Sequence, residues 1–333
     1  VAGLELRKHF RPGSVLRDGK QLASRLRRDP FDVVHAHLLG DHLVAALALR
    51  GLGDRRPVLI RSVYDAVAPR RGWRTWLAFG ATDGVVVPSA AVGEQLVTRL
   101  GVPRDRVLVQ DPPTESFRDR YAGDLRARLG LAREDFVVGI TARIQPHRRF
   151  ELCWETLALL VQREPRVRFV LLGRGNATDT ERLVSEPIRR LGLARHVVLP
   201  GYLYEPEYGL ALRSFDAFLF LVPGSDGTCR AVREATARAI AAGGTGRGLV
   251  PHLLGPHPEL AALGECGLVA AEDPQALADA LLRLAVDESL RARLGRAGKA
   301  RAAGPADPRR AALRLLDFVG RLRDRRAGRR DER

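Results

Sequence analysis

The segment from Gly224 to Glu234 combines residue types and spacing that could perform chemistry. Asp226 and Glu234 lie eight positions apart, and Gly227 and Thr228 follow the first carboxylate directly. An apolar run that predicts a strand precedes the segment, and a helical pattern follows it. A glycine-containing loop at that junction presents backbone N–H groups to a sugar or phosphate oxygen. Taken alone, two acids at this spacing are common on solvated surfaces.

A cluster of arginines follows a second predicted strand, which covers residues 137–142. Arg143 comes directly after it, and Arg148 and Arg149 lie a few residues further on. A guanidinium group suits a diphosphate because it stays charged and donates hydrogen bonds in a fixed geometry. The chain is rich in arginine, so chance also supplies such a cluster. The pattern is compatible with an anion site but does not distinguish it from a chance cluster of arginines.

His37 ends a third predicted strand, Asp32 to His37. A histidine can be a functional residue because its ordinary pKa lies near neutrality. A buried or helix-capping histidine is the commoner explanation. Without further context, the function of His37 stays open.

Alternating strands and helices must position these residues. The hydrophobic pattern predicts strands at 32–37, 57–63, 84–88 and 106–110, with helices at 41–50 and 90–100. The prolines at 112 and 113 interrupt this series. A second series follows, with strands at 136–142, 167–172, 196–199 and 217–222 and helices that include 181–191, 274–285, 288–297 and 308–322. This alternation predicts α/β domains with parallel sheets.

Composition limits the class of protein. The 333 residues favour two domains, and 45% of them are hydrophobic but only 6% aromatic, as in helix-covered parallel sheets. No apolar run approaches the roughly 20 residues that span a bilayer, so we expect a cytoplasmic protein. The three cysteines are widely spaced, which excludes a disulfide framework and a CxxC metal pair.

The net charge of +16 is concentrated toward both ends of the chain. Such a charge attracts phosphates, anionic lipids or nucleic acid, although an arginine-rich solvated surface explains it equally well. The last residues, 323–333, are almost all charged, and we expect them to be frayed or disordered.

Taken in order, these segments resemble family-4 glycosyltransferases of the GT-B fold over nearly the whole chain. No single motif is specific, but their order is. The matching segments are residues 32–37, 88–89, 139–143 with Arg148, 171–175, 199–201, Asp216, 226–234, 258–260, and 264–269 with Asp273.

The resemblance implies two Rossmann-like domains that face each other across a cleft. Residues 1–113 would form an acceptor-side domain, incomplete at its N-terminus because the family's first strand and glycine-rich loop have no counterpart. Residues 114–306 would bind the nucleotide-sugar. Residues 307–333 would form a helix that packs back on the first domain, followed by a basic tail.

The same resemblance assigns roles to residues of the second domain. Arg143 and Arg148 would bind the donor diphosphate, and Glu234 the ribose. Asp226 would lie near the sugar hydroxyls, with backbone donors from Gly227 and Thr228.

In the first domain, the resemblance places His37 beside the reacting sugar. Family members use UDP-, GDP- or ADP-sugars and typically retain the anomeric configuration without a metal or other cofactor. The implied acceptor is a glycolipid, polysaccharide or small molecule of cell-envelope or polysaccharide biosynthesis. Peripheral contact with the inner face of an anionic membrane would be made through Arg61, Arg70, Arg71 and Arg74.

Several departures from the family pattern keep a second function open. Asp226 is one methylene shorter than the usual glutamate, and Arg148 and Arg149 replace a common Lys-Gly pair. After Glu234 the glycine run 243–248 replaces the usual start of a strand, so we expect a flexible connection with that strand distorted or lost. The alternative is a non-catalytic relative that binds a nucleotide or sugar. A nucleic-acid binder is disfavoured, because no recognised module or stacking platform is visible.

Overall fold

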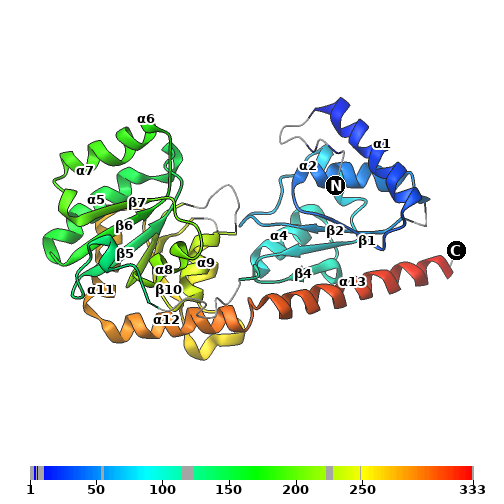
Figure 1. The fold of residues 1–333 in the computed structure, drawn as a ribbon. Coiled ribbons are helices and arrows are strands. Elements are labelled where there is room, and N and C mark those ends of the chain that lie inside the picture. Colours follow the sequence, from blue (N-terminus) through cyan, green and yellow to red (C-terminus); the bar gives the residue numbers. More distant parts are fainter. Residues whose placement is uncertain are drawn as a thin grey trace. The chain divides into compact units, whose positions relative to one another are not determined.

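The computed structural model describes residues 4, 6, 11–53, 56–114, 123–222, 228–247 and 249–331. The chain forms two compact units, each built on one parallel sheet (Figure 1). Unit 1 comprises Val1–Pro112 and Arg309–Arg333, and unit 2 comprises Pro113–Pro308. The roles that the sequence assigns to the two domains stay predictions.

Unit 1 contains a four-stranded parallel sheet in the order β1-β2-β3-β4. Its strands are β1 (Val33–Ala36), β2 (Val58–Ser62), β3 (Gly84–Val87) and β4 (Val107–Val109). Its helices are α1 (Pro12–Arg28), α2 (Leu39–Arg50), α3 (Trp73–Phe79), α4 (Ala90–Leu100) and α13 (Pro308–Asp331). Alternate residues of each strand pack on opposite faces of the sheet, as a pleated strand requires.

The two ends of the chain share the core of unit 1. Leu59 of β2 packs toward α2, whereas its neighbour Ile60 packs on the other face against Phe318 of α13. Gly84 allows this close packing, because a Cβ atom there would lie 2.8 Å from the Phe318 ring. The C-terminal helix is therefore part of the core of unit 1 (Figure 1).

The prediction of a frayed tail is wrong for the described residues after 322, because α13 continues to Asp331. Charged side chains near its end form ion pairs with other parts of unit 1. Arg323 pairs with Asp32 at 3.1 Å, and Arg325 pairs with Asp105. Arginine and alanine are also good helix formers, so packing at Phe318 can propagate the helix beyond the core.

Unit 2 contains a six-stranded parallel sheet in the order β10-β9-β8-β5-β6-β7. Its strands are β5 (Phe136–Thr141), β6 (Val167–Leu172), β7 (Val197–Gly201), β8 (Ala217–Phe220), β9 (Ala241–Thr245) and β10 (Gly267–Ala270). Its helices are α5 (Phe150–Arg163), α6 (Ala177–Thr180), α7 (Glu186–Arg190), α8 (Glu207–Arg213), α9 (Arg230–Ala237), α10 (Val250–Leu254), α11 (Pro274–Val286) and α12 (Glu288–Ala303), and a π-helical turn, Glu181–Ser185, joins α6 to α7. A large apolar core joins α5 and α11 to the sheet.

The strand order of unit 2 determines where a ligand can bind. From β5 the chain runs outward through β6 to β7, and it then returns to the other side of β5 to form β8, β9 and β10. The connections therefore diverge between β5 and β8. In open parallel sheets, such a topological switch opens a crevice at the carboxyl ends of the strands.

The expectation that the strand after Glu234 is distorted or lost is wrong. Residues 241–245 form β9, which is fully buried and pairs in parallel with both β8 and β10. The glycines are useful here because a Cβ atom at Gly244 would lie 2.8 Å from the carbonyl oxygen of Phe220. Close packing between neighbours outweighs the low strand propensity of glycine.

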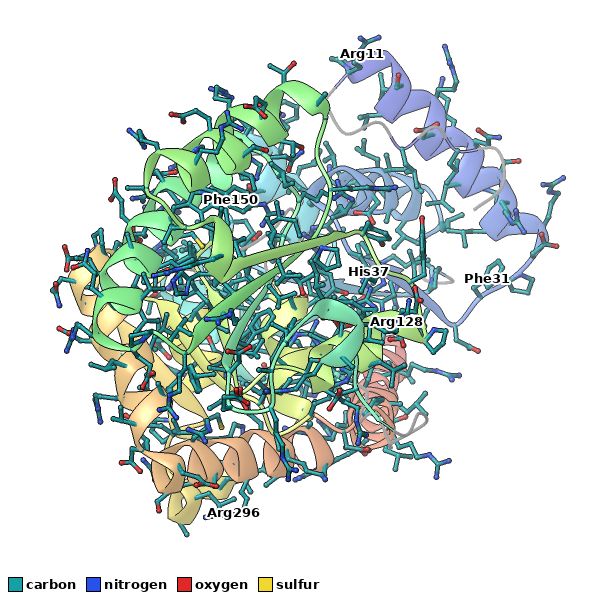
Figure 2. All side chains as sticks on the ribbon, turned by 60° about the vertical axis from the view of Figure 1, so that its left-hand side comes forward. Arg11, Phe31, His37, Arg128, Phe150 and Arg296 are labelled. Atoms are coloured by element: carbon teal, nitrogen blue, oxygen red, sulfur yellow. The ribbon has the colours of Figure 1, made fainter. Side chains whose placement is uncertain are left out.

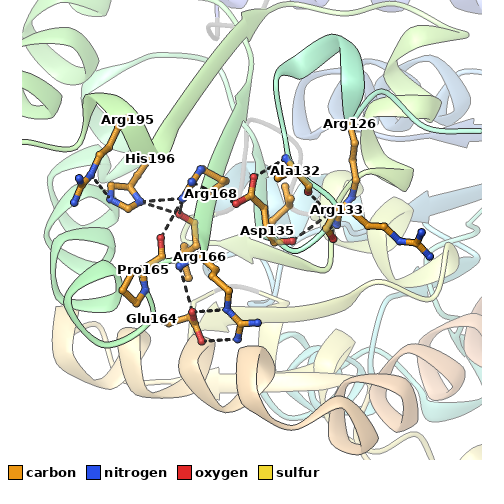
Figure 3. Close-up of polar contacts among 12 residues, drawn as sticks. Arg126, Ala132, Arg133, Asp135, Glu164, Pro165, Arg166, Arg168, Arg195 and His196 are labelled. Atoms are coloured by element: carbon orange, nitrogen blue, oxygen red, sulfur yellow. Dashed lines mark hydrogen bonds and ion pairs between the residues drawn. The ribbon is translucent and has the colours of Figure 1, made fainter.

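Polar contacts connect residues at the amino ends of the strands in the unit 2 sheet (Figure 3). Asp135, just before β5, accepts the backbone N–H of Ala132 at 2.7 Å and pairs with Arg168 of β6 at 3.4 Å. Arg126 pairs with Asp216 at 2.6 Å, and Asp216 also accepts the backbone N–H of Val137. These contacts tie the amino ends of β5, β6 and β8 together.

Truncation of Phe318 tests whether α13 stabilises unit 1. Phe318 is 2% exposed, so Phe318→Ala should lower the free energy of unfolding of unit 1 by about 3–5 kcal/mol. Leu316→Ala on the same helix is the matched control, because Leu316 is 65% exposed and its loss should cost about 0.5 kcal/mol or less. Denaturant unfolding measures both, and equal effects would contradict this packing.

Candidate functional site

A pocket of about 430 Å³ lies in unit 2 at the carboxyl ends of β5, β6, β7 and β8. We call it the switch-point pocket. Its volume is in the range of small-molecule sites. It is lined by Thr141, Ala142, Arg143, Arg148, Leu172, Gly173, Arg174, Tyr202, Leu203, Tyr204, Glu205, Tyr208, Phe220, Cys229, Arg230, Ala231 and Glu234.

The pocket depends on close packing where β5 and β6 end. A Cβ atom at Gly173 would lie 1.8 Å from the carbonyl oxygen of Ala142. Only glycine therefore allows the two strand ends to approach this closely. The backbone N–H of Gly173 also donates to the Gly201 carbonyl of β7 at 2.9 Å. Three strand ends are held together beneath the pocket.

Arg143 and Arg148, both predicted from sequence, line the pocket together. Arg143 follows β5 and is exposed, while Arg148 ends the short helix η4 (Pro146–Arg148) and is half-buried. Arg148 donates through Nη1 to the Val222 carbonyl at 3.3 Å, but its buried Nε has no hydrogen-bond partner. Burial, and then the positive charge of Arg143, lowers the pKa of Arg148. Within the described ranges neither arginine pairs with a carboxylate, so an anion would satisfy both.

Arg149, predicted in the same cluster, has a different environment. Its backbone is left-handed, with φ of 59°, where glycine is favoured. Its side chain pairs with Glu151 at 2.5 Å and with Glu272 at 3.1 Å. These ion pairs occupy the Arg149 guanidinium, which does not line the pocket.

Glu234 reaches the same pocket from the fifth position of α9. It is only 6% exposed, and both of its carboxylate oxygens accept hydrogen bonds. Arg230 donates to Oε1 at 2.7 Å, and the Tyr208 hydroxyl donates to Oε2 at 2.8 Å. Burial, followed by the nearby charge of Glu234, raises the pKa of Tyr208, so the phenol stays protonated and can donate. A carboxylate has about four acceptor positions, so Glu234 keeps capacity for further donors.

The loop before α9 contains the remaining predicted residues of this site. Asp226 and Gly227 lie outside the described residues. Thr228 accepts two hydrogen bonds from Arg233, at 2.8 Å to its carbonyl and 3.0 Å to its hydroxyl. Cys229 precedes the helix with φ of 51°, a left-handed backbone that is rare for residues with a side chain.

Sequence reasoning missed one wall of the pocket. The Arg174 guanidinium lies 4.7 Å from the ring centroid of Tyr202, and the Tyr202 and Tyr204 rings meet edge to face at 4.8 Å. Tyr208, the donor to Glu234, was missed as well. The available signal was the position of these aromatic residues just after a predicted parallel strand, whose carboxyl end shares an edge with the others.

In unit 1, His37 follows β1 and its side chain is exposed (Figure 2). It is therefore not a buried histidine. Its Nδ1 lies 2.5 Å from the Tyr64 hydroxyl, and its backbone N–H donates to Asp41 at 3.0 Å. Asp41 thereby caps α2 and also holds the backbone of His37, the first residue after β1. The imidazole lies at the carboxyl edge of the unit 1 sheet.

Two neighbours of His37 are shielded from solvent, His35 partly and Arg61 almost fully. His35 lies 2.8 Å through Nε2 from the Ser62 hydroxyl. Burial, followed by the charges of His37 and Arg61, lowers the pKa of His35 to about 4. Arg61 is also buried, which corrects the prediction that it belongs to a membrane-facing surface with Arg70, Arg71 and Arg74. Those three residues are exposed.

No group of three or more His, Cys, Asp or Glu side chains in the described ranges could hold a metal ion. The features that stand out are instead a cationic pocket and a buried carboxylate at the topological switch of a parallel sheet. Together with a second parallel-sheet unit, they define an α/β protein of two units, one of which has a pocket suited to an anionic ligand.

Comparison with known proteins specifies the family. Residues 123–301 match the family model of glycosyl transferases group 1, and residues 1–113 match that of glycosyltransferase family 4. The first match covers more than half of the chain, so this protein belongs to the glycosyl transferases group 1 family. The resemblance predicted from sequence motifs is confirmed.

A curated relative gives a more distant comparison. A D-inositol 3-phosphate glycosyltransferase from Stackebrandtia nassauensis is 29% identical over 224 residues, which cover 64% of this chain and 48% of the relative. The chain thus spans about half the length of the curated relatives it matches.

Solved structures confirm the fold class. HepE from Anabaena in complex with UDP has a TM-score of 0.69 at 17% identity, covering 92% of this chain and 82% of HepE. A glycosyltransferase from Rickettsia africae has a TM-score of 0.75 at 14% identity, covering 95% and 83%. At such low identity the likeness shows the fold alone, which is that of two parallel-sheet α/β domains of the GT-B type.

Tyr208→Phe tests the hydrogen bond that orients Glu234. Removing the hydroxyl leaves a buried carboxylate with one donor fewer, which should lower the free energy of unfolding of unit 2 by about 1–3 kcal/mol. Tyr204→Phe is the control, because Tyr204 is 68% exposed. Denaturant unfolding of both variants gives the comparison, and an unchanged Tyr208→Phe protein would contradict the geometry.

The low pKa of His35 predicts a pH dependence for unit 1. The unfolded chain takes up this proton near pH 6.5, whereas the folded chain resists it until about pH 4. Stability should therefore fall as the pH decreases through this window, by up to about 1.4 kcal/mol per pH unit. His42, with its pKa lowered by burial to about 3, adds a loss of the same sign.

The measurement is denaturant unfolding at several pH values within that window. His35→Asn should reduce the slope of the unfolding free energy against pH by the contribution of about one proton. The surface variant His147→Asn should leave this slope unchanged. Equal slopes in His35→Asn and the parent chain would contradict the assignment.

Proposed function

We propose that this chain is a retaining glycosyltransferase, which moves a sugar from a nucleotide-sugar to a glycolipid, polysaccharide or small-molecule acceptor. The observation that carries the proposal is the switch-point pocket, which combines Arg143, Arg148 and the buried carboxylate of Glu234. The UDP bound by the structurally similar HepE supports a nucleotide ligand.

The diphosphate of the donor is assigned to Arg143 and Arg148. Their mutual repulsion and the unpartnered Nε of Arg148 favour an anion between them. The same guanidinium groups would stabilise the charge that develops on the departing nucleoside diphosphate. They contribute to binding and to the transition state alike.

The ribose is assigned to Glu234. A carboxylate held by Tyr208 and Arg230 is fixed in position and can accept hydrogen bonds from the ribose hydroxyls on its remaining lone pairs. Because the side chain is buried, it is shielded from competing water. Glu234 should therefore affect nucleotide affinity for any base.

The sugar end of the donor is assigned to Asp226 and to the backbone N–H groups of Gly227 and Thr228, with His37 beside the reacting sugar. In the retaining reaction, the acceptor oxygen bonds to the anomeric carbon on the face from which the phosphate departs. The bond from that carbon to the phosphate oxygen breaks, and the acceptor proton passes to that phosphate oxygen. Positioning and charge stabilisation then supply the catalysis.

The proposal leaves the base open among UDP, GDP and ADP. It assigns charge neutralisation to arginines, so neither a metal nor another cofactor is required. It also places the protein in the cytoplasm, in cell-envelope or polysaccharide biosynthesis, at the inner membrane face. The proposed membrane contact is peripheral. No helix in the described ranges is long and apolar enough to span a bilayer.

A non-catalytic relative that keeps nucleotide binding is the second candidate. Asp226 favours it, since the shorter side chain reaches less far than glutamate. Incubation with labelled donor and acceptor separates the two, because only the enzyme produces labelled glycoside or free sugar.

Thermal unfolding with UDP, GDP, ADP and their sugars tests donor binding. One nucleotide at about 100 times its Kd should stabilise unit 2 by about 2.7 kcal/mol, which raises Tm by several degrees. Glu234→Gln should lose most of this shift, whereas the exposed control Glu155→Gln should keep it. No shift with any nucleotide would contradict the proposed site.

Paired substitution of the arginines tests the diphosphate assignment. Arg143→Gln with Arg148→Gln should weaken nucleoside diphosphate binding by at least about 100-fold, because two charge-assisted contacts are lost. The corresponding nucleoside should bind both proteins equally, and EDTA should change neither result. Calorimetric titration measures these affinities; retention of diphosphate affinity in the double variant would reject the assignment.

A further inference from the structure

The exposed imidazole of His37 is held by contacts that leave one ring nitrogen available (Figure 2). Its Nδ1 lies 2.5 Å from the Tyr64 hydroxyl, and the two rings are parallel to within 5° with their centroids 5.9 Å apart. In the part of the chain that the structure describes, Nε2 of His37 forms no hydrogen bond. This nitrogen is therefore available to an external ligand.

The contact between His37 and Tyr64 follows from the pairing of two strands. His37 is the first residue after β1, and Tyr64 is the second residue after β2. The two strands pair in parallel, so the chain leaves both of them at the same edge of the sheet. Asp41, in the first turn of α2, accepts the backbone N–H groups of His37 and Leu38 at 3.0 and 2.7 Å. The backbone that carries the imidazole is therefore fixed as well.

The hydrogen bond between the two side chains has a favoured direction. A phenol can donate or accept, whereas a neutral imidazole has one nitrogen of each kind. Tyr64 is half-buried, and among the described residues its hydroxyl has no hydrogen-bond partner other than His37. The phenolic proton therefore has one protein acceptor, which is Nδ1 of His37. When Nδ1 accepts, the proton of the neutral imidazole lies on Nε2.

The neighbouring charges favour the same direction. Arg61 is 7% exposed and interacts electrostatically with Tyr64 and Asp41. A nearby positive charge stabilises the negative charge that grows on a phenol oxygen as it donates. The ring centroid of His35 lies 4.2 Å from that of His37, but burial, followed by the charges of His37 and Arg61, lowers the pKa of His35 to about 4. His35 is therefore neutral at pH 7 and adds no charge that would reverse the preference.

We infer that Tyr64 is a positioning residue, which donates to Nδ1 of His37 and thereby leaves a protonated Nε2 for the ligand. His37 is then a hydrogen-bond donor to an oxygen atom of the sugar. It does not serve as the general base that takes the acceptor proton, because its available nitrogen already carries a proton. The identity of the ligand rests on the proposed function, whereas the tautomer of His37 does not.

Nitrogen NMR of the histidine side chains tests the tautomer without any substrate. In the neutral imidazole of His37, Nδ1 should have the chemical shift of an unprotonated, hydrogen-bonded nitrogen, and Nε2 that of a protonated one. Tyr64→Phe keeps the ring but removes the hydroxyl, so the Nδ1 resonance of His37 should move. The resonances of His147, an exposed histidine of unit 2, should stay unchanged, and His37→Gln assigns the signals. A proton on Nδ1 in the parent chain, or a spectrum that Tyr64→Phe leaves unaltered, would overturn the inference.

Turnover of labelled donor with acceptor tests whether Tyr64 acts through His37. Tyr64→Phe should lower kcat by about tenfold, as expected for the loss of one hydrogen bond. Its affinity for the nucleoside diphosphate should not change, because the switch-point pocket lies in unit 2. In a His37→Ala background, Tyr64→Phe should have no further effect on kcat. Val67→Ala is the control, because Val67 is 55% exposed just after Tyr64, and this variant should behave like the parent chain.

The possible outcomes separate this inference from the proposed function. If Tyr64→Phe lowers kcat equally with and without His37, Tyr64 acts independently and the inference is wrong. If Tyr64→Phe lowers kcat only in proportion to a loss of folded protein in denaturant unfolding, its role is structural and the inference is again wrong. If the parent chain turns over no donor at all, the proposed function fails, while the NMR experiment still decides the tautomer of His37.

Discussion

The arrangement of β5 between β6 and β8 is the constraint on which the candidate site depends. Because the strands are parallel, all their carboxyl ends lie at one edge, and the connections diverge on either side of the β5–β8 pair. Residues distant in sequence, such as Arg148 and Glu234, are thereby brought to one pocket. The site therefore depends first on chain topology, and only then on individual side chains.

Local packing then converts this topology into a pocket that can hold a charged ligand. Gly173 lets two strand ends meet, and Tyr208 and Arg230 hold the Glu234 carboxylate in place. The Nε of Arg148 is buried without a hydrogen-bond partner, which is energetically unfavourable unless an anion binds there. The same features therefore favour the binding of a diphosphate in this pocket.

Sequence patterns predicted the parallel sheets and several site residues because both follow from short-range periodicity and strand ends. Arg143, Arg148 and Glu234 were found in this way and do share a pocket. The errors arose where distant parts of the chain decide the outcome. Buried pairing with β8 and β10 makes a strand of a glycine run, and contacts with unit 1 carry α13 through its charged end.

Burial of charged groups was likewise beyond reach from sequence. Arg61 was predicted to lie on the surface with Arg70, Arg71 and Arg74, yet it is buried. The Tyr208 donor to Glu234 was missed because Tyr208 lies on another helix. Periodicity predicts which face of an element is apolar, but not which distant element covers it.

The most direct measurement for the central claim is an experimental structure of the chain with a nucleoside diphosphate bound. The account predicts the diphosphate within hydrogen-bond distance of Arg143 and Arg148, with the ribose hydroxyls on Glu234. A nucleotide bound elsewhere in unit 2, or a diphosphate that touches neither arginine, would contradict it.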